Sequence, residues 1–112
     1  MDKEKAAILQ GTLDLLVLKT VETMGPLHGW AIAKRIEQVS EDLLEMKYGT
    51  LYPALMRLEQ SGWISSEWGT SENNRRARFY SITKQGRKQL ALEAKNWAQM
   101  VAFITRVLGS TR

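Results

Sequence analysis

The chain has 112 residues, contains no cysteine and carries a formal net charge of +4. This length fits one domain with a modest core, and the lack of cysteine excludes disulfides and thiolate metal sites. The charged start of the chain and the lack of an apolar run of about 20 residues argue against a secretory leader and a membrane span, so we expect a cytoplasmic protein.

The charge is unevenly distributed along the chain. Residues 1–60 carry seven basic and nine acidic side chains, whereas residues 61–112 carry nine basic and three acidic ones. Between residues 73 and 92 there are six basic side chains and no acidic one. Such a one-sided basic stretch is typical of a surface that binds a polyanion, although a solvated run of charges has the same composition.

The first predicted element is a helix over residues 12–24, because its apolar residues recur at helical spacing. One apolar stripe consists of Leu13, Leu16, Val17, Val21 and Met24, and a second face of Leu15 and Leu18. A helix that is apolar on two sides is buried on two sides. We therefore expect it to pack against its own domain and also against a partner chain.

A break at residues 25–29 precedes a second predicted helix over residues 30–39. Its core stripe consists of Ile32, Ile36 and Val39. His28, in the break, is the only histidine of the chain. Without cysteine or a second histidine it is a poor metal ligand and a poor catalytic base, so we expect a structural role in the turn and no metal site.

A third helix is predicted over residues 50–60, with Thr50 as its N-cap and Pro53 in its first turn. The residues Ser61 and Gly62 end it. On a helical wheel the core side consists of Leu51, Leu55 and Leu58.

The other side of this helix carries Thr50, Ala54 and Arg57. Small side chains at Thr50 and Ala54 would let the helix approach base edges closely, and Arg57 can bond guanine or a phosphate. Tyr52 lies on the flank, where DNA contact and packing inside the domain are both compatible with the wheel.

Residues 63–68 and 78–82 are rich in aromatic and β-branched side chains and predict two strands joined by a loop over residues 69–74. A short helix followed by a basic β-ribbon is the layout of a winged helix-turn-helix, a mainly α fold with a small β-hairpin wing (α+β). The helix can enter the major groove while the ribbon reaches the backbone or the minor groove. The residues expected to contact DNA are Lys47, Tyr48, Thr50, Tyr52, Ala54, Arg57, Asn73, Asn74, Arg75, Arg76 and Arg78.

Thr83 is the predicted cap of a last helix of about 25 residues, which gives a DNA-binding unit over residues 1–83 and a dimerisation helix over residues 84–112. This helix carries an apolar seam in which the spacing alternates between four and three residues, as in a coiled coil. The seam consists of Leu90, Ala94, Trp97, Val101, Ile104 and Leu108. We expect it to form a homodimer interface, the alternative being packing onto its own domain alone.

Trp97 has two interpretations, as a packing anchor of the seam or as the aromatic wall of a site for a planar aromatic small molecule. No cofactor is expected.

Several spaced segments carry a family resemblance: PLHGWAIAKRI at 26–36, GTLYPALMRLE at 49–59, GWI at 62–64 and RFYSITKQG at 78–86. They resemble PadR-like transcriptional regulators, of the shorter subgroup that dimerises through one C-terminal helix. The resemblance implies a homodimeric winged-helix repressor, which a small molecule releases from DNA in some members. The chain departs from the family pattern at Trp30, where tyrosine is more usual, and at the wing tip, which starts with Asn73-Asn74 instead of a Gly-Arg type.

Other classes of protein fit the sequence less well. A winged-helix module that binds proteins would have an acidic or neutral wing and a bulky apolar recognition face. An enzyme would need paired carboxylates, a Gly-rich phosphate loop or a nucleophile beside a base, and none is recognisable here. Direct RNA binding is harder to exclude, because the same basic charge would serve it. It would be signalled by tighter binding of single strands than of duplexes, through stacking on aromatic rings. We therefore expect double-stranded DNA with a pseudo-palindromic operator as the partner.

Overall fold

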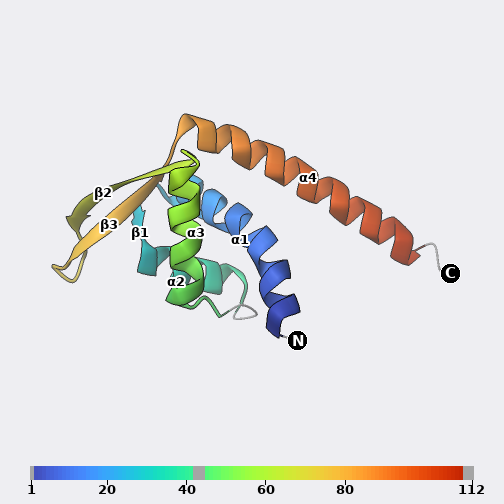
Figure 1. The fold of residues 1–112 in the computed structure, drawn as a ribbon, viewed down its shortest axis with the longest axis horizontal. Helices are drawn as coiled ribbons and strands as arrows, with labels where there is room; N and C mark the ends of the chain where they lie inside the picture. The colour runs from blue at the N-terminus through green and yellow to red at the C-terminus, as the bar shows by residue number, and fades with distance from the viewer. Residues whose placement is uncertain (1, 42–44, 110–112) are drawn as a thin grey trace.

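A computed structural model describes residues 2–41 and 45–109, with side chains described for residues 12–41 and 45–109. The elements, in chain order, are α1 (Asp2–Met24), β1 (Leu27–His28), α2 (Gly29–Val39), α3 (Tyr48–Gln60), β2 (Ile64–Thr70), β3 (Arg76–Ile82) and α4 (Lys84–Gly109). Helices α1, α2 and α3 form the body, and the β2–β3 hairpin and α4 extend from it on opposite sides (Figure 1). The predicted mainly α fold with a β-hairpin wing is confirmed.

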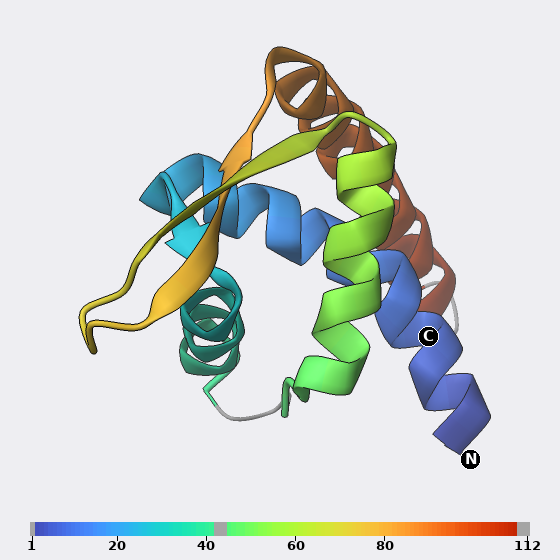
Figure 2. The ribbon, with the colours of Figure 1, turned by 60° about the vertical axis from the view of Figure 1, so that its left-hand side comes forward.

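The three strands form an antiparallel sheet in the order β1-β3-β2. In the hairpin, Ile64 lies opposite Ile82 and Thr70 lies opposite Arg76. Both strands extend two residues further toward the tip of the hairpin than the predicted strands, 63–68 and 78–82. The tip lies clear of the helices (Figure 2). The two-residue strand β1 was not predicted, since it lies within the expected break and forms only by pairing with β3, where Leu27 lies opposite Tyr80.

The core lies between the three body helices, the inner face of the sheet and the start of α4. Its buried hydrophobic side chains are Leu13, Val17, Leu18, Val21, Ile32, Ala33, Ile36, Leu51, Ala54, Leu55, Leu58, Ile64, Tyr80 and Leu90. Burying one large apolar side chain contributes roughly 1.5–3 kcal/mol. Leucine, isoleucine and valine therefore supply most of the stability of the small domain. Within the described residues no helix has the length and apolar character of a membrane span.

Two helices begin earlier than the apolar stripes predicted. Helix α1 starts at Asp2 instead of residue 12, because lysine, glutamate, alanine and glutamine at its start favour helix without forming an apolar stripe. Helix α3 starts at Tyr48, with Lys47 as an N-cap whose side chain makes no capping hydrogen bond. Thr50 is therefore not the N-cap, and Pro53 lies beyond the first turn, where it deprives the Gly49 carbonyl of its usual helical donor.

Two residues that were predicted on core stripes are exposed. Val39, at the end of α2, is 64% exposed, and Met24, at the end of α1, is 47% exposed. Each follows the apolar spacing of its helix, but each lies at the helix end, beyond the elements that cover the rest of the stripe. Both side chains line a pocket between α1 and α2.

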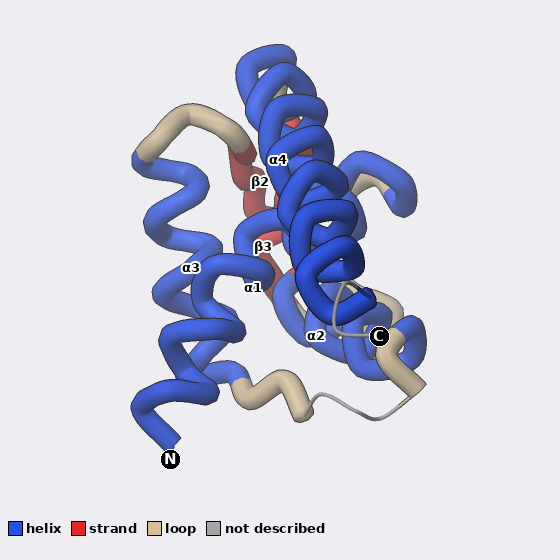
Figure 3. Tube along the Cα trace, turned by 90° about the vertical axis from the view of Figure 1, so that its right-hand side faces the viewer, coloured by secondary structure: helices blue, strands red, loops and turns tan. Residues whose placement is uncertain are grey.

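Helix α4 begins as predicted, because the Thr83 hydroxyl accepts a 2.9 Å hydrogen bond from the Gly86 N–H. Its first turns pack on α1, and the helix then projects away from the body on the side opposite the strands (Figure 3). Leu90 is only 7% exposed and belongs to the core of its own domain. The prediction that Leu90 lies in a dimer interface is therefore wrong. The large apolar side chains that α4 leaves 45–69% exposed are Leu92, Trp97, Met100, Val101, Phe103, Ile104, Val107 and Leu108.

Candidate nucleic-acid interface

Helix α3 buries one side and exposes the other, as a recognition helix must. Its core side consists of Leu51, Ala54, Leu55 and Leu58. Ala54 is 1% exposed, so the prediction that it faces the groove is wrong. The physical reason is helical spacing: Ala54 is three residues after Leu51 and four before Leu58, which places all three on one stripe.

The exposed side of α3 is broader and more aromatic than predicted. Tyr48 and Tyr52 pack against each other with ring centroids 5.4 Å apart, and Tyr52 remains 41% exposed. Thr50 is exposed, as the wheel predicts. Met56 is exposed as well, and the wheel could have shown this, because position 56 lies opposite the leucine stripe.

Gly29 allows Tyr48 to lie against the start of α2. A Cβ atom at residue 29 would be 3.1 Å from the Tyr48 ring and 3.6 Å from Leu55, so a larger residue would displace the tyrosine. The first turn of α3 is thus fixed by contact with α2, in place of a side-chain cap.

Arg57 is engaged within the domain. Its guanidinium donates a 2.5 Å hydrogen bond to the Asp14 carboxylate of α1, in an ion pair whose side chains are 40% and 21% exposed. The contact ties α3 to α1. A DNA contact from Arg57 stays a prediction, and it would have to share the guanidinium with Asp14 or break this pair.

The tip of the β2–β3 hairpin is a tight turn organised by Ser71. Its N–H donates to the Arg75 carbonyl at 2.8 Å, and its carbonyl accepts from the Asn74 N–H at 2.9 Å. Its hydroxyl accepts from the Arg75 N–H at 3.3 Å. Asn74 has a positive φ of 59°, which asparagine tolerates better than most residues. The side chains of residues 72–76 are exposed around this turn.

Trp68 organises the arginines along the side of the hairpin, a role that the sequence did not suggest. The guanidinium carbon atoms of Arg76 and Arg78 lie 4.7 Å and 5.2 Å from the centroid of its ring. Trp68 lies opposite Arg78 in the strand register, so the cation–π contacts hold both charges on one face of the hairpin. Knowledge of the register would have been needed to find this cluster from the sequence.

A second contact orients Arg78 toward α3. Its Nε donates a 2.8 Å hydrogen bond to the Ser66 hydroxyl, which itself donates a 2.6 Å bond to the Glu59 carboxylate. This chain joins both hairpin strands to the last turns of α3. The angle between the hairpin and α3 is thereby fixed by side chains as well as by the backbone.

Between the hairpin and the starts of α2 and α3 lies a concave surface of about 490 Å³, rich in aromatic rings and arginines. Its lining includes His28, Trp30, Tyr48, Tyr52, Trp68, Arg76, Arg78 and Tyr80. Burial raises the pKa of the Tyr80 phenol above its usual range, and the neighbouring Tyr48, Tyr52 and Glu59 raise it further. Tyr80 is therefore neutral at physiological pH and adds no negative charge to a surface that displays two arginines.

Two more sequence predictions have structural outcomes here. His28 caps α2, since its Nδ1 accepts a 3.3 Å hydrogen bond from the Ala31 N–H, which confirms its structural role. Lys47 is exposed before α3 and pairs with Glu45 at 3.7 Å. Such an exposed pair is weak and leaves the lysine available to a phosphate.

A model of the transcriptional regulator PadR-like family matches residues 17–92, which include the second and third helices, the hairpin and the start of α4. The chain belongs to the PadR-like family of transcriptional regulators. Membership implies DNA-binding regulation, and PadR-like proteins are regulators and not enzymes. The predicted family and the predicted lack of enzymatic activity are confirmed on this ground.

The chain is also similar to individual proteins. The solved structure of a transcriptional regulator from Clostridium thermocellum is 30% identical, with a TM-score of 0.80 over 89% of this chain and 96% of that one. A PadR family regulator from Clostridium difficile is 28% identical, with a TM-score of 0.73 over 87% and 98%. An uncharacterized protein X of Lysinibacillus sphaericus is 26% identical over 89% of this chain and 91% of its own length.

Proposed function

We propose that this PadR-like regulator is a homodimeric, sequence-specific repressor that binds a pseudo-palindromic operator. The observation that carries the proposal is the arrangement of α3 and the hairpin. The exposed start of α3 and the arginines beside Trp68 border one concave surface. A duplex can therefore meet a helix in its major groove and a basic ribbon on its backbone at the same time.

The residues of this surface have different proposed roles. Thr50 and Tyr52 on α3 face the bases, whereas the hairpin supplies phosphate contacts that give affinity more than sequence preference. The residues proposed to contact DNA are Lys47, Tyr48, Thr50, Tyr52, Asn73, Asn74, Arg75, Arg76 and Arg78. Arg57 is proposed to act in the domain, through Asp14, and to reach DNA only if that pair opens.

The proposed dimer rests on the exposed apolar side chains of α4. Trp97, Val101 and Ile104 each remain about half exposed on one helix, although such side chains are normally buried. Pairing of two α4 helices would cover them. A two-fold dimer would then present two copies of α3 to half-sites about one helical turn apart.

Release by a planar aromatic small molecule is the proposed regulation, with Trp97 as a wall of its site. The ring is exposed and lies on the proposed interface, where it could stack on a flat ligand. A fluorescence titration with planar cationic and phenolic compounds tests this proposal. The emission of the native protein should change at saturation, and that of the Trp97→Phe variant should not. An equal response from both proteins would place the ligand away from Trp97.

The decisive experiment for DNA binding is an anisotropy titration against the duplex upstream of the protein's own gene. A scrambled duplex and the separated strands serve as competitors. We expect binding that resists both competitors and that saturates at two chains per operator. If the scrambled duplex competes equally well, duplexes that bind are selected from a random pool. If every selected duplex is also matched by its own scrambled counterpart, the sequence-specific function is wrong. Tighter binding of the single strands would favour stacking of bases on the exposed rings.

A further inference from the structure

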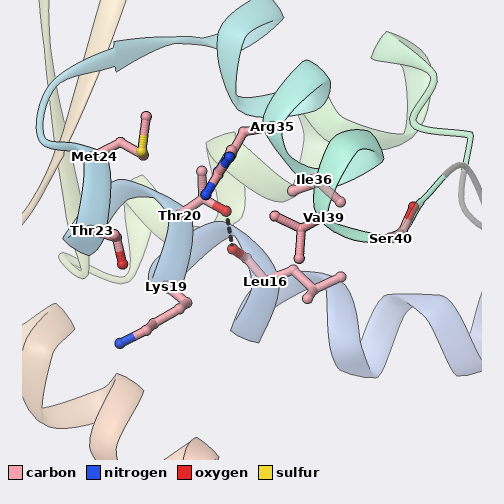
Figure 4. Close-up of a pocket in the computed structure, with 9 residues that line it drawn as sticks. All are labelled: Leu16, Lys19, Thr20, Thr23, Met24, Arg35, Ile36, Val39 and Ser40. Carbon is pink, nitrogen blue, oxygen red and sulfur yellow. Dashed lines mark hydrogen bonds between the residues drawn. The ribbon is translucent and has the colours of Figure 1, made fainter.

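A second concave surface lies between α1 and α2, separate from the candidate nucleic-acid interface (Figure 4). Its volume is about 250 Å³, and its walls are mainly aliphatic: Leu16, Met24, Ile36 and Val39. Ile36 also belongs to the core, so the pocket opens directly onto the packed interior of the domain. None of the side chains that line it is aromatic or acidic.

Val39 and Met24 at this pocket leave apolar surface in contact with water, which is unfavourable in the isolated domain. Both are large apolar side chains at helix ends, and each remains about half exposed or more. A ligand that covered them would remove apolar surface from water, which favours binding. A flexible methionine and branched aliphatic walls fit an irregular aliphatic group, and they offer no ring face on which a flat molecule could stack.

Arg35 gives the pocket its charge. Figure 4 shows this side chain extending from α2 toward Thr20 of α1, over the aliphatic walls. Arg35 makes no hydrogen bond or ion pair with the part of the chain that the structure describes. Lys19, the other cation of the lining, donates to Glu22 at 3.1 Å and so forms a nearly neutral pair.

Two of the three hydroxyl groups in the lining, those of Thr20 and Ser40, are already used as donors, and the third belongs to Thr23. Thr20 donates a 2.7 Å hydrogen bond to the Leu16 carbonyl, and Ser40 donates a 2.9 Å bond to the Glu37 carbonyl. The guanidinium of Arg35, with its five N–H groups, is therefore the main charged donor that the lining offers to a ligand, beside the single hydroxyl of Thr23. A guanidinium favours a carboxylate, which can accept two parallel hydrogen bonds from it.

We propose that this pocket binds a small aliphatic carboxylate, with its chain between Leu16, Ile36 and Val39 and its carboxylate on Arg35. The site does not include Trp97 or any residue proposed to contact DNA. It is independent of the proposed function, because neither DNA binding nor dimerisation is needed for a ligand to occupy it.

The test is a titration of the isotope-labelled protein with octanoate, followed by NMR of the backbone amides. We expect saturable shifts at Thr20, Thr23 and Val39. Octylammonium has the same chain and the opposite charge, and 2-naphthoate has the same charge and a flat apolar body. Both should bind more weakly than octanoate. Binding of octylammonium as tight as that of octanoate would exclude an anion site, and equal binding of naphthoate would exclude an aliphatic one.

Two variants test the residues, with a matched control. Arg35→Gln should weaken octanoate about two- to fivefold, the range expected for an exposed ion pair, and Val39→Glu should weaken it further by placing a like charge in the wall. Lys34→Gln removes the same charge from the neighbouring position, where Lys34 lies 5.4 Å from the Trp30 ring, and should leave affinity unchanged. Equal effects of Arg35→Gln and Lys34→Gln would overturn the site.

Two further outcomes would also overturn the proposal. Octanoate shifts confined to α4 would mean that the ligand covers the exposed seam, with no site between α1 and α2. Pocket signals that move with protein concentration and do not respond to octanoate would mean that a second copy of the chain covers this surface.

Discussion

Gly86 lies in the first turn of α4, at a position where there is no room for a Cβ atom. A Cβ atom at this position would lie 1.9 Å from the Trp63 carbonyl oxygen and 2.8 Å from Ile82 Cγ1. Backbone cannot move aside as a side chain can. We predict that Gly86→Ala lowers the free energy of unfolding by about 3 kcal/mol, at the upper end of overpacking effects.

Urea denaturation at a fixed protein concentration measures this loss. Gly49→Ala is the matched control, because a Cβ atom there meets nothing within 4 Å. It should leave stability unchanged or raise it by up to about 1 kcal/mol through helix propensity. If the Gly86→Ala protein is as stable as the native one, the Trp63 backbone and α4 can move apart without lowering the free energy of unfolding.

The pair between Asp14 and Arg57 makes a second prediction for single residues. A double-mutant cycle with Asp14→Ala and Arg57→Ala should give a coupling free energy of about 0.5–1 kcal/mol, since both partners are partly exposed. If Arg57 acts only in the domain, Arg57→Ala will weaken all operator variants alike. Loss of preference at one base pair, by about 1–3 kcal/mol, would instead assign Arg57 to base recognition.

At the residue scale, the sequence predicted contacts that depend on nearby positions and missed those that depend on distant ones. The buried leucines of α3, the cap formed by Thr83 and the structural role of His28 in the turn follow from local spacing and residue type. The partner of Arg57 lies 43 residues away, and Trp68 meets its arginines only through the strand register. Ala54 was misplaced for another reason, because a small residue on an apolar stripe gives little signal of burial.

At the scale of elements, the hairpin is predicted to contribute affinity through charge. The variant with Arg75→Ala and Arg76→Ala should bind all duplexes more weakly and flatten the dependence of log K on log salt by about 2 units at most. Anisotropy titrations at several salt concentrations measure the slope. The control removes two exposed charges from α4, Lys88→Ala with Lys95→Ala, and should leave the slope unchanged. A native slope in the hairpin variant would exclude the wing tip from the interface.

The type and order of the longer elements could be predicted because their apolar periods are clear. The starts of α1 and α3 could not be predicted, since the structure starts α1 within lysine and glutamate and starts α3 after Lys47 without a side-chain cap. Strand β1 has only two residues and exists through its pairing with β3. Two residues are too few to show a hydrophobic period, so no local sequence pattern predicts this strand.

For the whole molecule, the proposed dimer makes the exposed seam of α4 essential. Val101→Glu places a charge among apolar side chains and should shift the protein from dimer to monomer in analytical ultracentrifugation. The domain should stay folded, since Val101 is 45% exposed and lies outside the core. Gln99→Glu adds the same charge at an exposed position off the seam and should remain dimeric. If Val101→Glu and Gln99→Glu show the same proportions of monomer and dimer, the seam of α4 does not hold the two chains together.

The 26 residues of α4 also form a lever. At 1.5 Å per residue the helix is about 39 Å long, so a tilt of about 5° at one end displaces the other by about 3.4 Å. That displacement equals roughly one base step along a DNA strand. In the proposed dimer, a change in helix angle too small to break any contact in the core would therefore shift one half-site contact by a whole base pair. The stiffness of α4 would then set how closely the regulator measures the spacing of its operator.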